Sequence, residues 1–141
     1  AGRLSGDLQA RRDLTIALEN VAGMVENSDP GRALGLYEES LDISRDLAVR
    51  LPGNLQALSD RGVSAARLAQ LLPTEDPERI PLWREAAISF RDALAIQPEN
   101  KELARMSCLA ALHYACCDPD DRDEWLAYAA ELAERFGFGK E

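Results

Sequence analysis

The segment Gly53-Asn54-Leu55-Gln56-Ala57 decides the fold, because it is a second copy of Gly6-Asp7-Leu8-Gln9-Ala10. A looser third copy is Glu99-Asn100-Lys101-Glu102-Leu103. The copies lie about 46–53 residues apart, depending on the landmark, and self-similarity at such a period is typical of stacked supersecondary units. The repetition therefore predicts an array of similar units rather than one globular core around a catalytic pocket.

A second motif repeats downstream of the first. Ala33-x-x-x-Tyr37-x-x-Ser40-Leu41 recurs as Ala86-x-x-x-Phe90-x-x-Ala93-Leu94, and more faintly as Glu124-x-x-x-Tyr128-x-x-Glu131-Leu132. Spacings of three and four mark one face of a helix. Each unit therefore holds two helices, and short connections make neighbouring helices antiparallel. We expect one domain, 1–141, with repeats at approximately 5–52, 53–98 and 99–136.

Six helices follow from the periodicity and from the residues that start and stop helices, at about 7–26, 30–51, 54–72, 81–96, 99–117 and 119–136. Asp29-Pro30 and Asp118-Pro119 each offer a capping carboxylate followed by a proline at the first helical position. The fourth helix is placed from Pro81, which would clash inside a helix begun earlier. The predicted buried stripe of the first helix is Leu14, Ala17, Leu18, Val21, Ala22 and Val25. No segment alternates apolar and polar residues between turn signals, so the expected fold class is all-α.

Composition restricts the classes of partner. The formal charge of −9, from 25 acidic and 16 basic residues, argues against nucleic acid and anionic membranes, because both need a basic footprint. No run approaches the ~18 apolar residues of a membrane span, and no signal peptide is present. Three clustered cysteines indicate reduced thiols in a cytoplasmic protein. The chain begins without Met inside a repeat, so we expect a fragment of a longer protein.

Few residues suit catalysis or metal binding. His113 and Cys117 share a helix face, but the adjacent Cys116 points about 100° away from Cys117. Adjacent acids such as Glu38-Glu39 and Asp120-Asp121 do not face each other on a helix. The sequence therefore predicts no enzyme activity, no cofactor and no metal. Two aromatic residues are expected to pack at repeat seams rather than to form ligand platforms, namely Trp83 and Trp125.

The repeated landmarks resemble the tetratricopeptide repeat (TPR). That family places a small residue in the first helix of each pair, two small residues and an aromatic in the second, and often a closing proline. The matching residues are Ala22, Ala69 and Ala115, then Ala33, Ser40, Ala86 and Ala93, then Tyr37, Phe90 and Tyr128, then Pro52 and Pro98. The usual unit is about 34 residues, and these units are longer by about three helical turns. They resemble a long-helix variety common in large bacterial proteins with signalling or effector domains.

The resemblance implies a right-handed array of three antiparallel helix hairpins, a TPR-like α-solenoid. It also implies a concave groove lined by the first helix of each pair. The partner-binding residues carried over to that groove are Arg12, Glu19, Asn20, Arg67, Gln70, Arg105 and His113. Plain solvent exposure is the alternative for each. Members that clamp a C-terminal carboxylate use Lys and Asn. Only Asn20 matches, so we do not expect that ligand.

The sequence favours a non-catalytic protein interaction module that binds a peptide or partner domain in the groove. Three of the groove positions are arginines, which suits a partner segment with spaced acids. The alternative is that each arginine pairs with a local acid such as Asp13 or Asp60. A second hypothesis gives the array a structural, regulatory or oligomerisation role in a larger bacterial signalling or effector protein.

Overall fold

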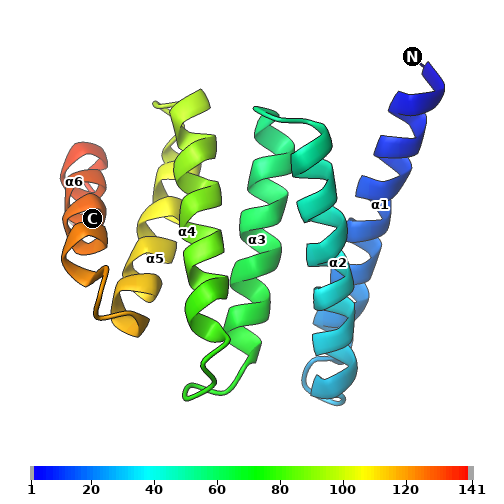
Figure 1. Ribbon diagram of the computed structural model, residues 1–141, viewed down its shortest axis with the longest axis horizontal. Coiled ribbons are helices and arrows are strands. Elements are labelled where there is room, and N and C mark those ends of the chain that lie inside the picture. Colours follow the sequence, from blue (N-terminus) through cyan, green and yellow to red (C-terminus); the bar gives the residue numbers. More distant parts are fainter. Residues whose placement is uncertain (1, 140–141) are drawn as a thin grey trace.

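The computed structural model describes residues 2–139, with side chains described from residue 6 onward. It contains α1 (Gly2–Val25), α2 (Pro30–Arg50), α3 (Leu55–Leu71), α4 (Arg79–Ile96), α5 (Lys101–Cys117) and α6 (Arg122–Phe136). The helices follow one another in chain order along the long axis and run alternately up and down (Figure 1). No strand occurs among the described residues. The predicted all-α class is therefore confirmed.

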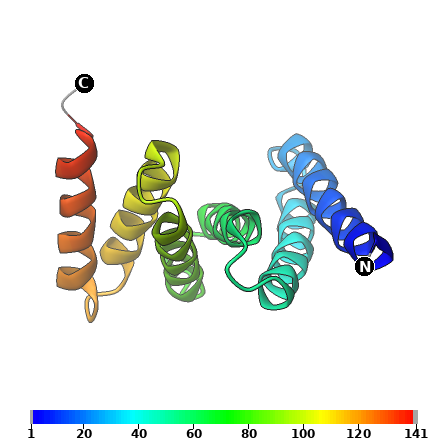
Figure 2. The same cartoon turned by 90° about the horizontal axis from the view of Figure 1, so that it is seen from above.

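Each helix contacts the helices next to it in the chain, from α1 on α2 to α5 on α6. Side chains also join alternate helices. Arg12 Nε of α1 donates to Asp60 Oδ2 of α3 at 2.9 Å, and Arg45 Nη2 of α2 donates to Glu85 Oε1 of α4 at 2.6 Å. The view from above shows the helices as a staggered row (Figure 2). We refer to α1, α3 and α5 as the A helices and to α2, α4 and α6 as the B helices.

Small residues at the helix crossings are buried as the repeat pattern predicts. Ala22, Ala69 and Ala115 have no exposed surface. The position seven residues before each of them is also buried and is occupied by Thr15, Gly62 and Cys108. On α3 this position is Gly62, where an added Cβ would lie 2.8 Å from Cε1 of Phe90. Real Cβ atoms do not come so close, so the absence of a side chain lets α3 and α4 pack around the Phe90 ring.

The start of α2 is as predicted, because Asp29 caps it by accepting from the Arg32 N–H at 3.2 Å. The fourth helix begins at Arg79, two residues before the predicted start. Pro81 is thus in the first turn, where its missing N–H removes no helical hydrogen bond. The first helix extends five residues further toward the N-terminus than predicted, to Gly2.

The predicted start of the sixth helix at Asp118-Pro119 is wrong, because α6 begins at Arg122. The carboxylate of Asp118 does not cap α6. It accepts from the Asp120 N–H at 3.0 Å and from the Tyr114 hydroxyl at 2.8 Å. This arrangement makes a turn after α5, and the helix starts only when the turn is complete.

The predicted stripe of α1 is only partly buried. Ala22 is fully buried, and Leu18 and Val25 are half-buried. Leu14, Ala17 and Val21 are exposed instead. The reason is that α1 stands at the end of the row, so helices cover one side of it only (Figure 1).

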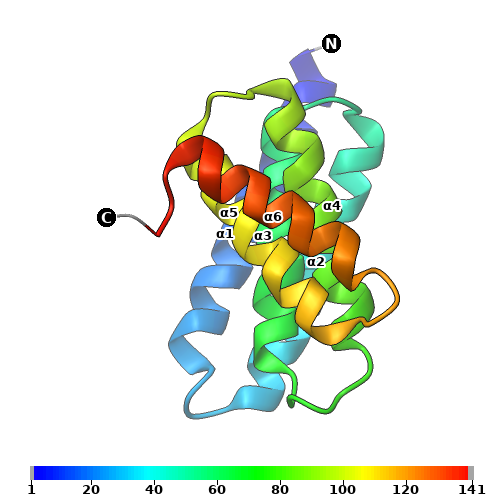
Figure 3. The same cartoon turned by 90° about the vertical axis from the view of Figure 1, so that its left-hand side faces the viewer.

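The last helix forms the other end and lies obliquely over α5 (Figure 3). It buries Trp125, Ala129 and Leu132. The half-buried Tyr128 shares a 2.8 Å hydrogen bond with the Ser107 hydroxyl on α5. Glu131, in the place of a small residue, is exposed. The helix thus buries one apolar face against α5 and exposes mainly charged side chains, together with Leu126, on the other.

Candidate functional site

Two hollows adjoin on the surface formed by the A helices, which we call the A face. The polar hollow lies between α1, α3 and the start of α2 and has a volume of about 670 Å³. Its lining consists of Glu19, Asn20, Gly23, Glu26, Asn27, Tyr37, Arg67, Gln70 and Leu71. Four of these residues are predicted partner-binding residues. The structure therefore brings together Glu19, Asn20, Arg67 and Gln70.

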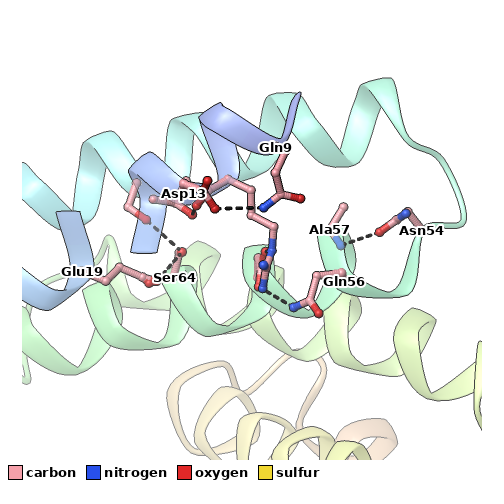
Figure 4. Close-up of polar contacts among 11 residues, drawn as sticks. Gln9, Asp13, Glu19, Asn54, Gln56, Ala57 and Ser64 are labelled. Carbon is pink, nitrogen blue, oxygen red and sulfur yellow. Dashed lines mark hydrogen bonds and ion pairs between the residues drawn. The ribbon is translucent and has the colours of Figure 1, made fainter. Parts of the chain in front are cut away.

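The Glu19 side chain in the polar hollow is only 13% exposed. Its Oε2 lies 3.6 Å from Arg67 Nη1. Its Oε1 accepts from the Ser64 hydroxyl at 3.3 Å (Figure 4). Burial raises the pKa of Glu19, although Arg67 and Ser64 both act to lower it. Arg67 therefore offsets only part of the cost of burying the negative charge of Glu19.

A second carboxylate borders the same hollow. The Tyr37 hydroxyl donates to Glu26 Oε2 at 3.4 Å. Burial raises the pKa of Tyr37, and the negative charge of Glu26 raises it further. Two acids and one arginine line the hollow, so its net formal charge is negative. It suits a positively charged or hydrogen-bond-donating group.

The apolar hollow lies between α3, α4 and α5 and has a volume of about 180 Å³. Its wall includes a stacked pair, because the rings of Trp83 and His113 lie 4.2 Å apart and within 8° of parallel. Burial and the nearby Arg79 charge lower the pKa of His113, so its ring is neutral at pH 7. The Trp83 Nε1–H is buried and has no acceptor among the described residues. The other residues of the lining are Val63, Ala66, Arg67, Gln70, Phe90, Met106, Leu109 and Ala110.

Arg67 and Gln70 line both hollows, so the two hollows lie next to each other on the A face. His113 joins this group through the apolar hollow. The sequence did not identify Tyr37, Glu26 or Trp83 as part of a site. Tyr37 and Trp83 are buried in the core, and this packing role hides a second role when only sequence patterns are considered. Trp83 does pack at a seam, as predicted, and it also supports His113.

The other two predicted residues lie apart from these hollows. Arg12 is engaged with Asp60 and lines a separate hollow of about 290 Å³ between α1, α2 and α3. Nearby polar contacts include Gln9 with Asp13 and the Asn54 cap on Ala57 (Figure 4). Arg105 Nη1 lies 3.3 Å from Glu102 Oε2, and its guanidinium lies 5.3 Å from the Phe138 ring centroid. All three groove arginines therefore have an acid within reach.

The cysteines are distributed as small side chains of a helix. Cys108 is buried, with Sγ 3.5 Å from the Ala129 carbonyl oxygen. Cys116 is exposed and Cys117 is half-buried. Within residues 2–139, no three His, Cys, Asp or Glu side chains are placed to hold a metal ion.

In the described part of the chain, no helix has the length and apolar character needed to span a membrane. The chain matches no known protein family, no curated protein and no solved structure.

Proposed function

We propose that the protein is a TPR-like, right-handed array of three helix hairpins whose A face binds a segment of a partner protein without catalysis. The observation that carries the proposal is the pair of adjoining hollows that share Arg67 and Gln70. One hollow is polar and negative, and the other is apolar. Such a combination of a few polar groups beside apolar surface is typical of a specific binding site.

The chemistry of the two hollows describes the segment. An aliphatic side chain suits the apolar hollow, beside Leu109, which is itself 52% exposed. A lysine or arginine suits the polar hollow, where Glu19 and Glu26 outnumber Arg67. This proposal replaces the acidic segment expected from the sequence. Arg12, Arg67 and Arg105 each already lie beside an acid, which reduces their attraction for a further carboxylate.

The test fills the polar hollow without changing any charge. Gly23 lines this hollow, and an added Cβ there would meet only the Tyr37 hydroxyl, at 4.0 Å. Gly23→Leu should block the hollow while favouring helix α1. Gly35→Leu is the matched control, because Gly35 lies in α2 with nothing within 4 Å of an added Cβ.

Proteins captured by the parent chain would be identified by mass spectrometry, and their capture would be compared between the two variants. We expect the specific partner to be retained by the Gly35→Leu protein and lost by the Gly23→Leu protein. Equal capture by both folded variants would place the binding surface elsewhere.

A structural role is the second candidate, and a specific observation favours it. The contacts of Arg12 with Asp60 and of Arg67 with Glu19 join α1 to α3, so these arginines connect neighbouring repeats. If the role is structural, Gly23→Leu should leave the activity of the larger protein unaltered. Replacing Arg12 and Asp60 would lower stability by an amount typical of exposed pairs, about 0.2–1 kcal/mol.

A further inference from the structure

The polar and the apolar hollow differ at two corresponding positions of the repeat. Glu19 corresponds to Ala66 in the next repeat, and Tyr37 corresponds to Phe90. Glu19 and Tyr37 line the polar hollow, whereas Ala66 and Phe90 line the apolar hollow. The fold therefore accepts side chains without polar groups at both positions, and helix packing does not require the carboxylate or the hydroxyl.

The carboxylate of Glu19 has weaker contacts than a similarly buried carboxylate elsewhere in the molecule. The Glu85 side chain is 11% exposed and accepts hydrogen bonds from two arginines at 2.6–2.8 Å. Glu19 accepts from the Ser64 hydroxyl at 3.3 Å (Figure 4), and Arg67 Nη1 lies 3.6 Å away, beyond hydrogen-bonding distance. An ionised carboxylate can accept about four hydrogen bonds. Glu19 can therefore accept further bonds from a donor in the hollow.

The charge of Glu19 also lowers the stability of the folded chain. Burial raises the pKa of Glu19, so folding disfavours its ionised form. An alanine occupies the same place in the next repeat, so packing does not explain the carboxylate. Side chains that lower stability without a packing role are typical of functional sites. Contact with a ligand would explain this carboxylate.

The rest of the lining indicates which cation fits. Asn20, Asn27 and Gln70 each carry an amide oxygen, and Glu26 carries a second carboxylate. A guanidinium group has five N–H donors in a planar fork, whereas an ammonium group has three. Guanidinium is also more weakly hydrated, so it loses less hydration when it moves beside a half-buried carboxylate. A hollow with several acceptors therefore suits guanidinium better than ammonium.

We propose that the polar hollow is a binding site for the guanidinium group of an arginine side chain, and that Glu19 determines its specificity. The guanidinium donates two parallel hydrogen bonds to the Glu19 carboxylate. Arg67 is 48% exposed and moves aside, since exposed ion pairs contribute little to stability. One added positive charge balances Glu19 and Glu26 against Arg67. The inference rests on the proposed function, because it identifies one side chain of the segment that the A face binds.

The probe for this site is N-acetylarginine amide, which lacks free α-amino and carboxyl groups, as does an arginine within a chain. Binding would be followed by NMR through the side-chain NH₂ signals of Asn20, Asn27 and Gln70. We expect saturable shifts with a Kd on the order of 1 mM, as for a single small group. N-acetylcitrulline amide has a similar shape without the charge and should bind at least about tenfold more weakly. Nα-acetyllysine amide should also bind more weakly than the arginine probe.

Two matched variants test the role of Glu19. Glu19→Gln keeps the shape and removes the charge, so it should weaken binding of the arginine probe at least about tenfold. Glu39→Gln makes the same charge change at an exposed position of α2 outside both hollows and should bind as the parent chain does.

Glu19→Ala with Tyr37→Phe gives the polar hollow the side chains of the next repeat. The double variant should stay folded, as judged by circular dichroism, and lose the preference for arginine over citrulline.

Several results would overturn the proposal. One is equal binding of the arginine and citrulline probes, and another is a Glu19→Gln protein that binds the arginine probe as well as the Glu39→Gln protein does. A lysine probe that binds as tightly as the arginine probe would show that the hollow recognises charge alone. Free arginine that binds at least about tenfold more tightly than its blocked amide would assign the hollow to a small molecule instead.

Leu109→Ser separates this inference from the proposed function. Leu109 lines the apolar hollow and not the polar one, so the variant should bind the arginine probe normally and capture less of the partner. An arginine site without a captured partner would contradict the proposed function alone, and is the result expected if the arginine belongs to another segment of the same protein. A captured partner without any preference for the arginine probe would contradict this inference alone.

Discussion

Two helical glycines in this chain, Gly62 and Gly35, have different surroundings, so substitution of each should have a different effect on stability. At Gly62 an added Cβ would lie 2.8 Å from the ring of the buried Phe90. At Gly35 it would meet nothing within 4 Å. Helix propensity favours alanine over glycine by about 1 kcal/mol at both positions. The packing around each glycine therefore decides whether substitution raises or lowers the free energy of unfolding.

We predict that Gly62→Ala lowers the free energy of unfolding by about 1–3 kcal/mol, because overpacking outweighs the gain in propensity. Gly35→Ala should raise it by about 0.5–1 kcal/mol. Urea denaturation followed by circular dichroism measures both. A Gly62→Ala protein as stable as the parent would show that Phe90 can move aside without cost.

Two half-buried carboxylates differ in the sign of their pKa shifts. Burial raises the pKa of Glu19 above the usual 4.5, and a single arginine does not reverse this. Burial also acts to raise the pKa of Glu85, but hydrogen bonds from Arg45 and Arg61 outweigh it and leave that pKa lowered. Ionised Glu19 therefore costs stability, whereas ionised Glu85 contributes it.

We predict opposite effects at neutral pH, with Glu19→Gln stabilising the protein and Glu85→Gln destabilising it. The Glu19 cost is complete above its raised folded pKa and disappears below 4.5. The Glu85 contribution is present above 4.5 and is lost as the pH falls through its lowered folded pKa. The melting temperatures of both variants, measured between pH 3 and 8 and compared with the unmodified protein, would show these opposite effects. Parallel curves for the two variants would contradict the assigned shifts.

At the scale of the helix, two B helices begin with the same device. Arg79 opens α4 and donates its Nε–H to the Ala69 carbonyl at 3.2 Å. Arg122 opens α6 and donates its Nε–H to the Ala115 carbonyl at 3.0 Å. Ala69 and Ala115 are corresponding residues near the ends of A helices. Each arginine therefore satisfies a carbonyl of the preceding helix and fixes where the next helix begins.

Replacing either arginine by methionine keeps much of the apolar stem and removes the donor. We expect Arg122→Met to lower the free energy of unfolding by about 1–3 kcal/mol, the usual effect of losing a hydrogen bond from a charged group. Guanidinium unfolding provides the measurement, with Arg32→Met as the control on the exposed start of α2. If the two substitutions cost the same, the carbonyl bond is not what holds α6 in place.

The helices themselves were largely predictable, because apolar spacing and capping residues act locally. Asp29 and Asn54 cap as their sequence context indicates. The start of α6 was not predictable in this way. It depends on the Tyr114 hydroxyl, which reaches both Asp118 and Asp121. In the candidate site too, some features follow from local sequence and others from contacts between helices. Repeat register placed Arg67 and Gln70 on the A face, but the ion pair of Arg67 with Glu19 depends on how α1 and α3 meet.

At the scale of the whole molecule, the two outermost helices, α1 and α6, differ in the side chains that they expose. The outer face of α6 has mainly charged side chains together with the exposed Leu126, whereas α1 exposes Leu14, Ala17 and Val21. Removal of α6 should therefore uncover an apolar surface like that of α1. Trp125 packs edge-on against Tyr114 with ring centroids 5.7 Å apart, and both side chains are buried.

We predict that truncation after Asp118 lowers the melting temperature and makes the protein self-associate, because the Tyr114 side of α5 becomes exposed. Sedimentation velocity and a thermal melt measure the two effects. The full chain at the same concentration is the reference. A truncated chain that stays monomeric with an unchanged melting temperature would remove the capping role from α6.

The restriction of helix contacts to near neighbours in the chain also has a kinetic consequence. Every contact that forms early closes only a short loop, so the entropic barrier to folding is low. Folding can start at any hairpin and spread along the row. Under native conditions, amide hydrogens of α6 should exchange with solvent by local opening, while those of α3 and α4, held from both sides, should exchange last.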